Sequence, residues 1–365
     1  MKRLVFAVFL CLTFLVFAGS LCFAAEVTES PDIKIVIDGN IGTYSNVPVI
    51  SDGRTLLPLR QVLVNLGVQN DDQHIIWDGA SRTVTINKDS TVITLTVGKS
   101  EAKVDSSNVT LDVAPMIYKD RTYIPARFVA QSLGKKVVWD SRLKAVLIRD
   151  EKQYDDIKKI IDSVNSTMKS FDNYKIAGES EMTINGSSMD ITSTSEVDVK
   201  KELIHVNQLV KSALQEAEQE FYISGDTMYM SIPNTGKWLK RPMTAEQLKE
   251  NSMDVGGDDT VYSSLTIADN SDPDEIKLSG NINLPGYFVQ DDGSAKLISK
   301  TFYTEIYIDK KTNTVKKVYT EISGDYTAIG QTLSCTLKTT STYSDFNGDF
   351  KVTMPEDIDS NSVTA

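Results

Sequence analysis

Reactive side chains are scarce in this sequence, and their number limits the chemistry that they could support. Of 365 residues, two are histidines, His74 and His205, and three are cysteines. Cys11 and Cys22 lie in the first 25 residues, so Cys335 is the one thiol left if that segment is removed, and no intramolecular disulfide can then form. A metal centre built on imidazole or thiolate ligands needs more of both. The sequence therefore predicts no catalytic residue, no metal site and no cofactor.

Other patterns that could support catalysis or calcium binding are also weak. Cys335 lies in an alternating segment, residues 331–338, where we expect a small buried side chain, and no base that could activate the thiol is visible. A Gly-x-Ser-x-Gly motif is absent from the sequence. The acidic stretches 254–259 and 269–275 lack the spacing and the terminal glutamate of an EF-hand, so we interpret them as solvated loops. We expect a protein that is not an enzyme.

Composition and charge describe a globular protein with an acidic C-terminal part. The chain is 41% hydrophobic and 24% charged, and its length allows two domains. The formal net charge is −12, and residues 151–365 carry 35 acidic against 21 basic side chains. Such a surface repels phosphate backbones, so no nucleic-acid partner is expected.

The first 25 residues have the pattern of a secretory signal peptide. Lys2 and Arg3 precede an apolar run, residues 4–18, which is shorter than the ~20 residues that a spanning helix needs. Small residues follow, and we expect cleavage after Ala25. Acylation at Cys22 is a second interpretation, although Leu21 occupies the position where a lipoprotein signal has a small residue. The predicted location is secreted or associated with the cell wall.

A motif occurs twice between residues 33 and 150, with an offset of 67 residues. Residues 48–67 and 115–134 both contain Arg-Thr-x-[Leu/Ile]-Pro-x-Arg and a Leu-Gly ending, and each is followed by Trp-Asp and an alternating run. We therefore expect two repeats, at about 33–87 and 92–149, each with a strand, a short helix and a hairpin. The residues that define the repeats are Arg54, Pro58, Arg60, Gly67, Trp77, Arg121, Pro125, Arg127, Gly134 and Trp139.

The motif predicts how each short helix begins and ends. Pro58 and Pro125 suit the first turn of a helix, where a missing N–H costs nothing. Gly67 and Gly134 are expected to end the helices in the left-handed conformation. Helices of about two turns are too short to be stable alone, so packing must hold them.

Two kinds of side chain in the repeats have alternative roles. Trp77 and Trp139 are predicted to anchor the core, because they occupy equivalent places beside apolar residues, although tryptophans can also stack on sugars. Arg60 and Arg127 are predicted to bond strand-end carbonyls or the aspartates after the tryptophans, with ligand binding as the alternative.

Residues 33–150 resemble the copper amine oxidase N-terminal-like domain, also called the stalk domain, in these motifs. The resemblance implies a non-catalytic appendage, because the oxidase chemistry of that family lies in a separate domain with histidine-bound copper and a tyrosine-derived quinone. Two histidines cannot supply such a site, so no copper site and no oxidase activity are carried over. In secreted bacterial proteins, domains of this kind are similar to surface modules beside variable partners.

The remainder of the chain, residues 151–358, is predicted to be one domain with a large antiparallel sheet. Residues 154–168 have the periodicity of an amphipathic helix. Alternating segments then predict meander strands in a strongly curved sheet, or half-barrel, with this helix and residues 245–267 as covering elements. The predicted strands are 174–184, 189–199, 202–210, 220–224, 227–231, 301–308 and 315–322.

This second part resembles uncharacterised secreted bacterial proteins with a LolA-like lipoprotein-carrier fold, in which a half-open barrel covers helices. The resemblance implies that acyl chains can lie between sheet and helices, but it identifies no ligand residue here. Aromatic and methionine residues around 221–230 are interpreted as strand core, and Trp238 either joins them or forms the rim of a ligand cavity.

Together these patterns predict an α+β protein of the cell envelope. A stalk domain would position a curved-sheet domain that binds a cell-wall polymer or an envelope protein. The alternative is a carrier or sensor that holds a lipid or another apolar ligand in the half-barrel.

Overall fold

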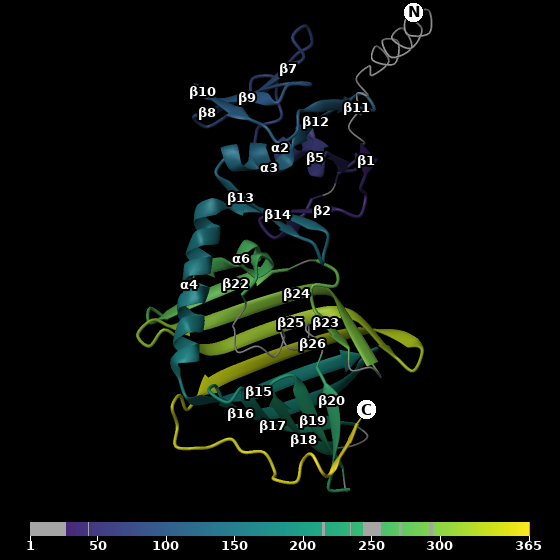
Figure 1. The fold of residues 1–365 in the computed structure, drawn as a ribbon, viewed down its shortest axis with the longest axis vertical. Helices are drawn as coiled ribbons and strands as arrows, with labels where there is room; N and C mark the ends of the chain where they lie inside the picture. The colour runs from purple at the N-terminus through teal and green to yellow at the C-terminus, as the bar shows by residue number, and fades with distance from the viewer. Residues whose placement is uncertain are drawn as a thin grey trace, which may run out of the picture. The chain divides into compact units, whose positions relative to one another are not determined.

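The computed structural model describes residues 27–42, 44–213, 216–233, 235–243, 257–269, 272–282, 284–291 and 295–364. The predicted signal peptide and Cys22 lie outside these residues. The predicted class is α+β, and the described chain is mostly strand with few helices (Figure 1). The chain divides into two compact units: Met1–Asp32 with Tyr44–Leu133, and Ile33–Thr43 with Gly134–Ala365.

The first unit contains two five-stranded sheets and two short helices. Strand β5 (Arg54–Pro58) pairs antiparallel with β12 (Arg121–Pro125), so that Tyr123 lies opposite Pro58 and Leu56 opposite Pro125. This pairing joins the two copies of the sequence motif side by side. The first sheet has the order β1 (Thr28–Glu29), β4 (Val49–Ser51), β5 (Arg54–Pro58), β12 (Arg121–Pro125), β11 (Met116–Tyr118). The second has the order β10 (Ser107–Thr110), β9 (Glu101–Val104), β8 (Thr91–Thr96), β7 (Thr83–Lys88), β6 (Ile75–Asp78).

Helices α2 (Leu59–Asn65) and α3 (Ala126–Ser132) begin directly after the two prolines. Pro58 and Pro125 are the N-cap residues, one position before the predicted first turn. Gly67 and Gly134 have φ values of 81° and 70°, which confirms the predicted left-handed conformation after each helix.

The second unit begins with a small sheet that combines segments distant in sequence. Its order is β13 (Lys135–Asp140), β14 (Ala145–Asp150), β2 (Lys34–Ile37), β3 (Asn40–Ile41), and β14 pairs parallel with β2. Helix α4 (Glu151–Ser170) follows β14 directly, and the Asp150 carboxylate accepts a hydrogen bond from the Gln153 N–H at its N-terminus. Its apolar stripe is buried in one core with Leu147 and Val36, so the small sheet packs against α4.

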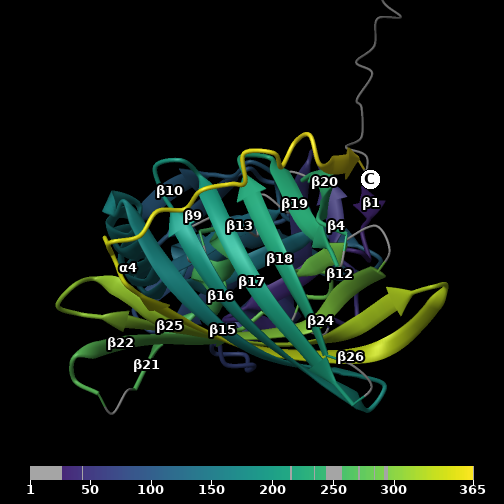
Figure 2. The ribbon, with the colours of Figure 1, turned by 90° about the horizontal axis from the view of Figure 1, so that it is seen from below.

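A large antiparallel sheet forms the rest of the second unit, and Figures 1 and 2 show its strong curvature. Among the described residues it has thirteen strands, and its central meander confirms the strands predicted from alternation. In sheet order these are β21 (Thr266–Ala268), β22 (Glu275–Asn281), β24 (Ala295–Asp309), β25 (Thr314–Ala328), β26 (Gln331–Ser344), β15 (Asn173–Ile184), β16 (Ser187–Asp198), β17 (Leu203–Ser212), β18 (Glu216–Ser224), β19 (Thr227–Ile232), β20 (Lys237–Pro242) and β27 (Ser362–Thr364), with β23 (Val289–Asp291) beside β24.

Strand alternation gives this sheet two chemically distinct faces. One face of the sheet packs against α4, and we call it the helix face. It carries Tyr174, Val197 and Ile306, which are buried in one core with Ile157 and Val164 of α4. Helix α6 (Asp259–Ser264) contributes to the same core. It lies in the segment predicted to cover the sheet, of which residues 244–256 are outside the described part. The opposite face carries the alternate residues of each strand.

Candidate functional site

The two repeat tryptophans are exposed, so the prediction that they anchor the core is wrong. Trp77 is 41% and Trp139 is 43% exposed. Among the described residues, the strands that carry them, β6 and β13, are edge strands of their sheets. Their cross-strand partners, Val84 and Val146, are buried instead.

The repeat arginines point to the surface in both copies. The Arg60 guanidinium donates to the side-chain oxygen of Asn70 over 2.8 Å, so its partner is neither a strand-end carbonyl nor Asp78. Arg54 forms an exposed ion pair of 2.9 Å with Asp112. Arg121 and Arg127 are also exposed.

Trp238 is buried on the opposite face of the large sheet, in a cluster that we call the Trp238 cluster. Its ring is 8% exposed and lies edge-on to Tyr222, with ring centroids 5.5 Å apart. The C-terminal segment covers this cluster, because Val352 and Ile358 pack into it. Trp238 is absent from the lining of the pocket described next. The cluster consists of Leu203, Tyr222, Tyr229, Trp238, Val352 and Ile358.

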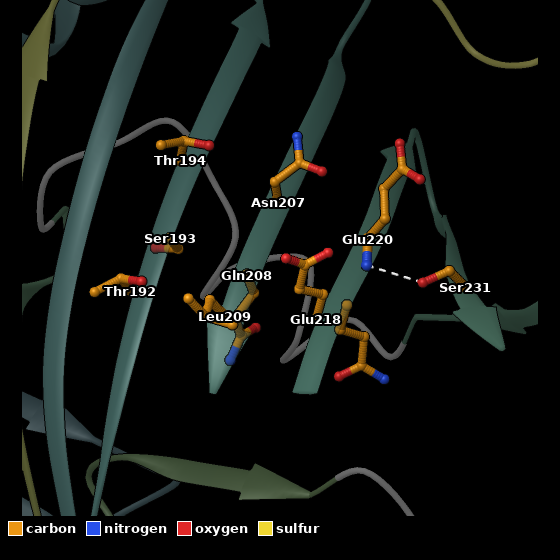
Figure 3. A pocket seen from close by; sticks show the side chains of 10 residues that line it. Thr192, Ser193, Thr194, Asn207, Gln208, Leu209, Glu218, Glu220 and Ser231 are labelled. Carbon is orange, nitrogen blue, oxygen red and sulfur yellow. Dashed lines mark hydrogen bonds between the residues drawn. The ribbon is translucent and has the colours of Figure 1, made fainter. Parts of the chain in front are cut away.

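A polar pocket of about 490 Å³ opens on the strands β16–β19 (Figure 3). Most of its lining side chains belong to the opposite face by strand alternation, and they offer hydroxyl, amide and carboxylate groups. The Glu220 N–H donates to the Ser231 hydroxyl over 2.9 Å across its edge. The lining consists of Thr192, Ser193, Thr194, Asn207, Gln208, Leu209, Glu218, Gln219, Glu220 and Ser231.

His205 lies beside this pocket but does not assemble a reactive centre. Its Nε2 is 2.8 Å from Glu220 Oε1, its Nδ1 is 3.8 Å from Glu196 Oε2, and its ring stacks on Tyr222 at 4.4 Å. Burial and the neighbouring Glu220 carboxylate raise the pKa of Tyr222 to about 12, so this phenol stays protonated at neutral pH. These contacts hold the ring in place, and in the described part of the chain none of them comes from a serine, threonine or cysteine side chain.

The remaining reactive groups named in the sequence are separated from one another. Cys335 is buried in β26, where burial raises the pKa of its thiol and keeps it protonated. Of the first acidic stretch, Asp258 caps α6 and Asp259 accepts a hydrogen bond from Tyr154. In the described part of the chain, no group of three or more His, Cys, Asp or Glu side chains could hold a metal ion.

Among the described residues, the helix face carries further apolar side chains beyond the core around α4. Fourteen side chains on β15–β20 and β26 point to this face, are half-buried and lie outside that core. Four of them are methionines, whose flexible side chains adapt to irregular apolar ligands. They are Met182, Ile184, Met189, Ile191, Val206, Val210, Phe221, Ile223, Met228, Met230, Ile232, Leu239, Leu333 and Leu337.

A lipid in the half-barrel was the alternative expected from the sequence, but these side chains were not identified as its lining, and those at 221–230 were interpreted as strand core. The alternation that predicts these strands places apolar residues on one face, but it does not tell a covered face from an open one. The signal that could have pointed to it is the excess of apolar strand positions over the short stretches of predicted helix available to cover them.

The structure therefore defines a mostly β protein with a strongly curved sheet, whose helix face packs against α4 and whose opposite face carries the Trp238 cluster and most of the polar pocket. Comparison with known families shows that residues 36–148 match the copper amine oxidase N-terminal domain, which confirms the resemblance predicted for residues 33–150. Residues 156–259 match a family of unknown function, DUF6612. Among curated proteins, none matches this chain.

Solved structures with distant similarity to this chain include two lipoproteins and a LolA superfamily protein. The lipoprotein LppX of Mycobacterium tuberculosis is 13% identical, with 55% of this chain and 99% of LppX covered and a TM-score of 0.33. LprF of Mycobacterium bovis is also 13% identical, with 55% of this chain and 97% of LprF covered and a TM-score of 0.30. A LolA superfamily protein of Nitrosomonas europaea is 8% identical, with 55% of this chain and 96% of that protein covered and a TM-score of 0.22.

None of the described helices is both long and apolar enough to cross a membrane.

Proposed function

We propose that this chain is a secreted, non-catalytic protein of the cell envelope whose curved sheet binds an apolar ligand, such as a lipid acyl chain, on its helix face. Residues 33–150 act as a stalk that positions the sheet, and a wall polymer or an envelope protein is the partner that this role predicts. The match of residues 36–148 to the copper amine oxidase N-terminal domain supports the stalk.

The observation that carries the proposal is the row of half-buried apolar side chains on the helix face. An extended apolar surface of this kind is unfavourable in water and marks a site that is covered by a ligand or a partner. Each methylene group of a bound chain that leaves water contributes about 0.8 kcal/mol. An acyl chain of ordinary length therefore gains enough free energy to bind without any charged anchor.

The proposed ligand binds by contact with apolar side chains on the helix face, and acidic residues on the opposite face disfavour an anionic group there. Phe221 and Met230 are cross-strand partners on the helix face and supply adjacent apolar contacts. Helix α4 contributes Ile160, which is partly buried against the core that α4 shares with the sheet. On the opposite face the polar pocket has Glu218 and Glu220 but no basic side chain, so it would disfavour an anionic headgroup there.

Lipid extraction and mass spectrometry of the purified full chain test this function. The wild-type chain should carry acyl lipids, or bind a fluorescent fatty acid after delipidation. Phe221→Glu should weaken that binding at least tenfold, because a carboxylate on the helix face cannot be desolvated cheaply. Leu209→Glu, on the opposite face, is the matched control and should bind normally. Lipid-free wild-type protein with no fatty-acid affinity, or equal binding by both variants, would contradict the proposal.

A further inference from the structure

The hairpin between β25 and β26 ends in a residue that its backbone conformation disfavours. Ala328 pairs with Gln331, so Ile329 and Gly330 form a two-residue turn, with φ values of 50° and 73°. Positive φ at both positions is the pattern of a type I′ turn, for which Asn-Gly or Asp-Gly is preferred. A β-branched side chain in this region is a conformational outlier.

Other tight turns of the chain use the preferred residues at the same conformation. Asn185-Gly186 joins β15 to β16 with φ values of 48° and 83°, and Asp52-Gly53 joins β4 to β5 with 51° and 69°. Among the described non-glycine residues with positive φ, Ile329 alone is apolar. Local turn chemistry therefore does not explain the isoleucine.

Packing does not explain it either, because the side chain touches solvent on all sides. Ile329 is 98% exposed, whereas the next most exposed large apolar side chain among the described residues, Ile267, is 56% exposed. The disfavoured backbone conformation of Ile329 and the exposure of its apolar side chain both lower the stability of the fold. Backbone strain that gives no structural benefit is typical of functional positions.

The surroundings of the tip are uncharged for twelve residues in a chain that is 24% charged. Residues 326–337 contain no acidic or basic side chain, and Asp325 and Lys338 flank this run. Tyr326 and Leu333 are cross-strand partners near the tip and lie on the helix face, half-buried. The apolar helix face therefore continues to the hairpin that ends in Ile329.

We propose that this hairpin tip, with Ile329 at its end, contacts a lipid bilayer surface and inserts the isoleucine into it. A two-residue turn is too small for a protein interface, since stable interfaces bury about 1,200 Å² or more. A bilayer, in contrast, accepts a single apolar side chain, and a tyrosine suits its interfacial region. The net charge of −12 opposes anionic lipid, so the contact favours zwitterionic membranes.

Flotation of the full chain with phosphatidylcholine vesicles tests the contact. Ile329→Asn should lower the partition coefficient about tenfold, which corresponds to about 1.4 kcal/mol. The same variant should raise Tm, because Asn-Gly fits the turn. Ile329→Trp should partition at least as strongly as the wild type. Ile267→Asn is the matched control, and its partition coefficient should equal that of the wild type.

Two results would overturn the contact: wild-type protein that does not float, or Ile329→Asn protein that floats as well as the wild type. Either result leaves the ligand on the helix face untouched, because that ligand is measured by extraction from protein free of vesicles. Failure of the bilayer contact and failure of the proposed function are therefore distinguishable.

Discussion

Glu305 is a carboxylate on the opposite face of the large sheet whose pKa is strongly lowered. It lies on the opposite face of β24 with its side chain 17% exposed, and it is paired with Lys277 at 2.7 Å. Tyr303 and Tyr307 donate to its two oxygens over 2.6 and 2.5 Å. Burial alone would raise the pKa of Glu305, but the hydrogen bonds from Lys277 and the two tyrosines outweigh it and lower the pKa to about 2.

This perturbation predicts a pH-dependent contribution to stability. The folded-state pKa lies below the unfolded value of about 4.3, so the charged carboxylate stabilises the fold above pH ~4.3, and the contribution disappears as the pH falls to about 2. Glu305→Gln should therefore lower the free energy of unfolding by about 1–3 kcal/mol at pH 7 and by progressively less below pH 4. Urea unfolding at several pH values measures this difference. Glu321→Gln is the control. It removes a carboxylate on the neighbouring strand β25, which accepts a hydrogen bond from Tyr319 of the same strand.

Single residues also show where prediction from residue type stops. Trp77 and Trp139 were expected in the core because large aromatic side chains gain most from burial. Burial depends on whether a strand is central or at an edge, however, and the local pattern of Trp-Asp and its neighbours is the same in both cases. The glycines were predictable because a left-handed backbone is a local property of the residue itself.

Secondary-structure elements were largely predictable, because their periodicity is local. The apolar spacing of residues 154–168 identified α4, and alternation identified β15–β19 and the central parts of β24 and β25. Prediction missed β20, β22 and the short strands β21, β23 and β27, and it noted only residues 331–338 of β26 as alternating. It could not give the parallel pairing of β14 with β2, because that contact joins residues more than 100 positions apart.

The approach of α6 to β22 depends on a glycine. A Cβ placed on Gly280 would lie 2.2 Å from the carbonyl oxygen of Ser264, the last residue of α6. Gly280→Ala must therefore separate the helix end from the sheet, and overpacking of this kind costs about 1–3 kcal/mol or more. Thermal unfolding should show a lower Tm for Gly280→Ala and a nearly unchanged Tm for Ser279→Ala. A wild-type Tm in Gly280→Ala would mean that α6 does not need this close contact.

At the scale of the whole molecule, the second unit is discontinuous in sequence. Leu147 of β14 and Val36 of β2 are 1% and 4% exposed and share a core with Ile157 of α4. Arg149 is 2% exposed and donates to the Ser263 carbonyl and to Gln153, which connects β14 with α6 and α4. In contact terms the small sheet therefore belongs with the curved sheet, although residues 36–148 match one family domain.

This arrangement predicts that a chain cut at residue 150 loses part of its core. A fragment of residues 151–365 would expose Ile157 and its neighbours on α4, so we expect a lower urea midpoint than for the same unit in the full chain and stronger binding of a hydrophobic dye. A second variant keeps the small sheet by replacing residues 44–133 with a flexible Gly/Ser linker, and it should retain the stability of the unit. If both variants keep the urea midpoint that the unit has in the full chain, the small sheet adds nothing to the second unit, and a boundary at residue 150 is favoured. A loss in both would show instead that residues 44–133 are needed for the second unit to fold.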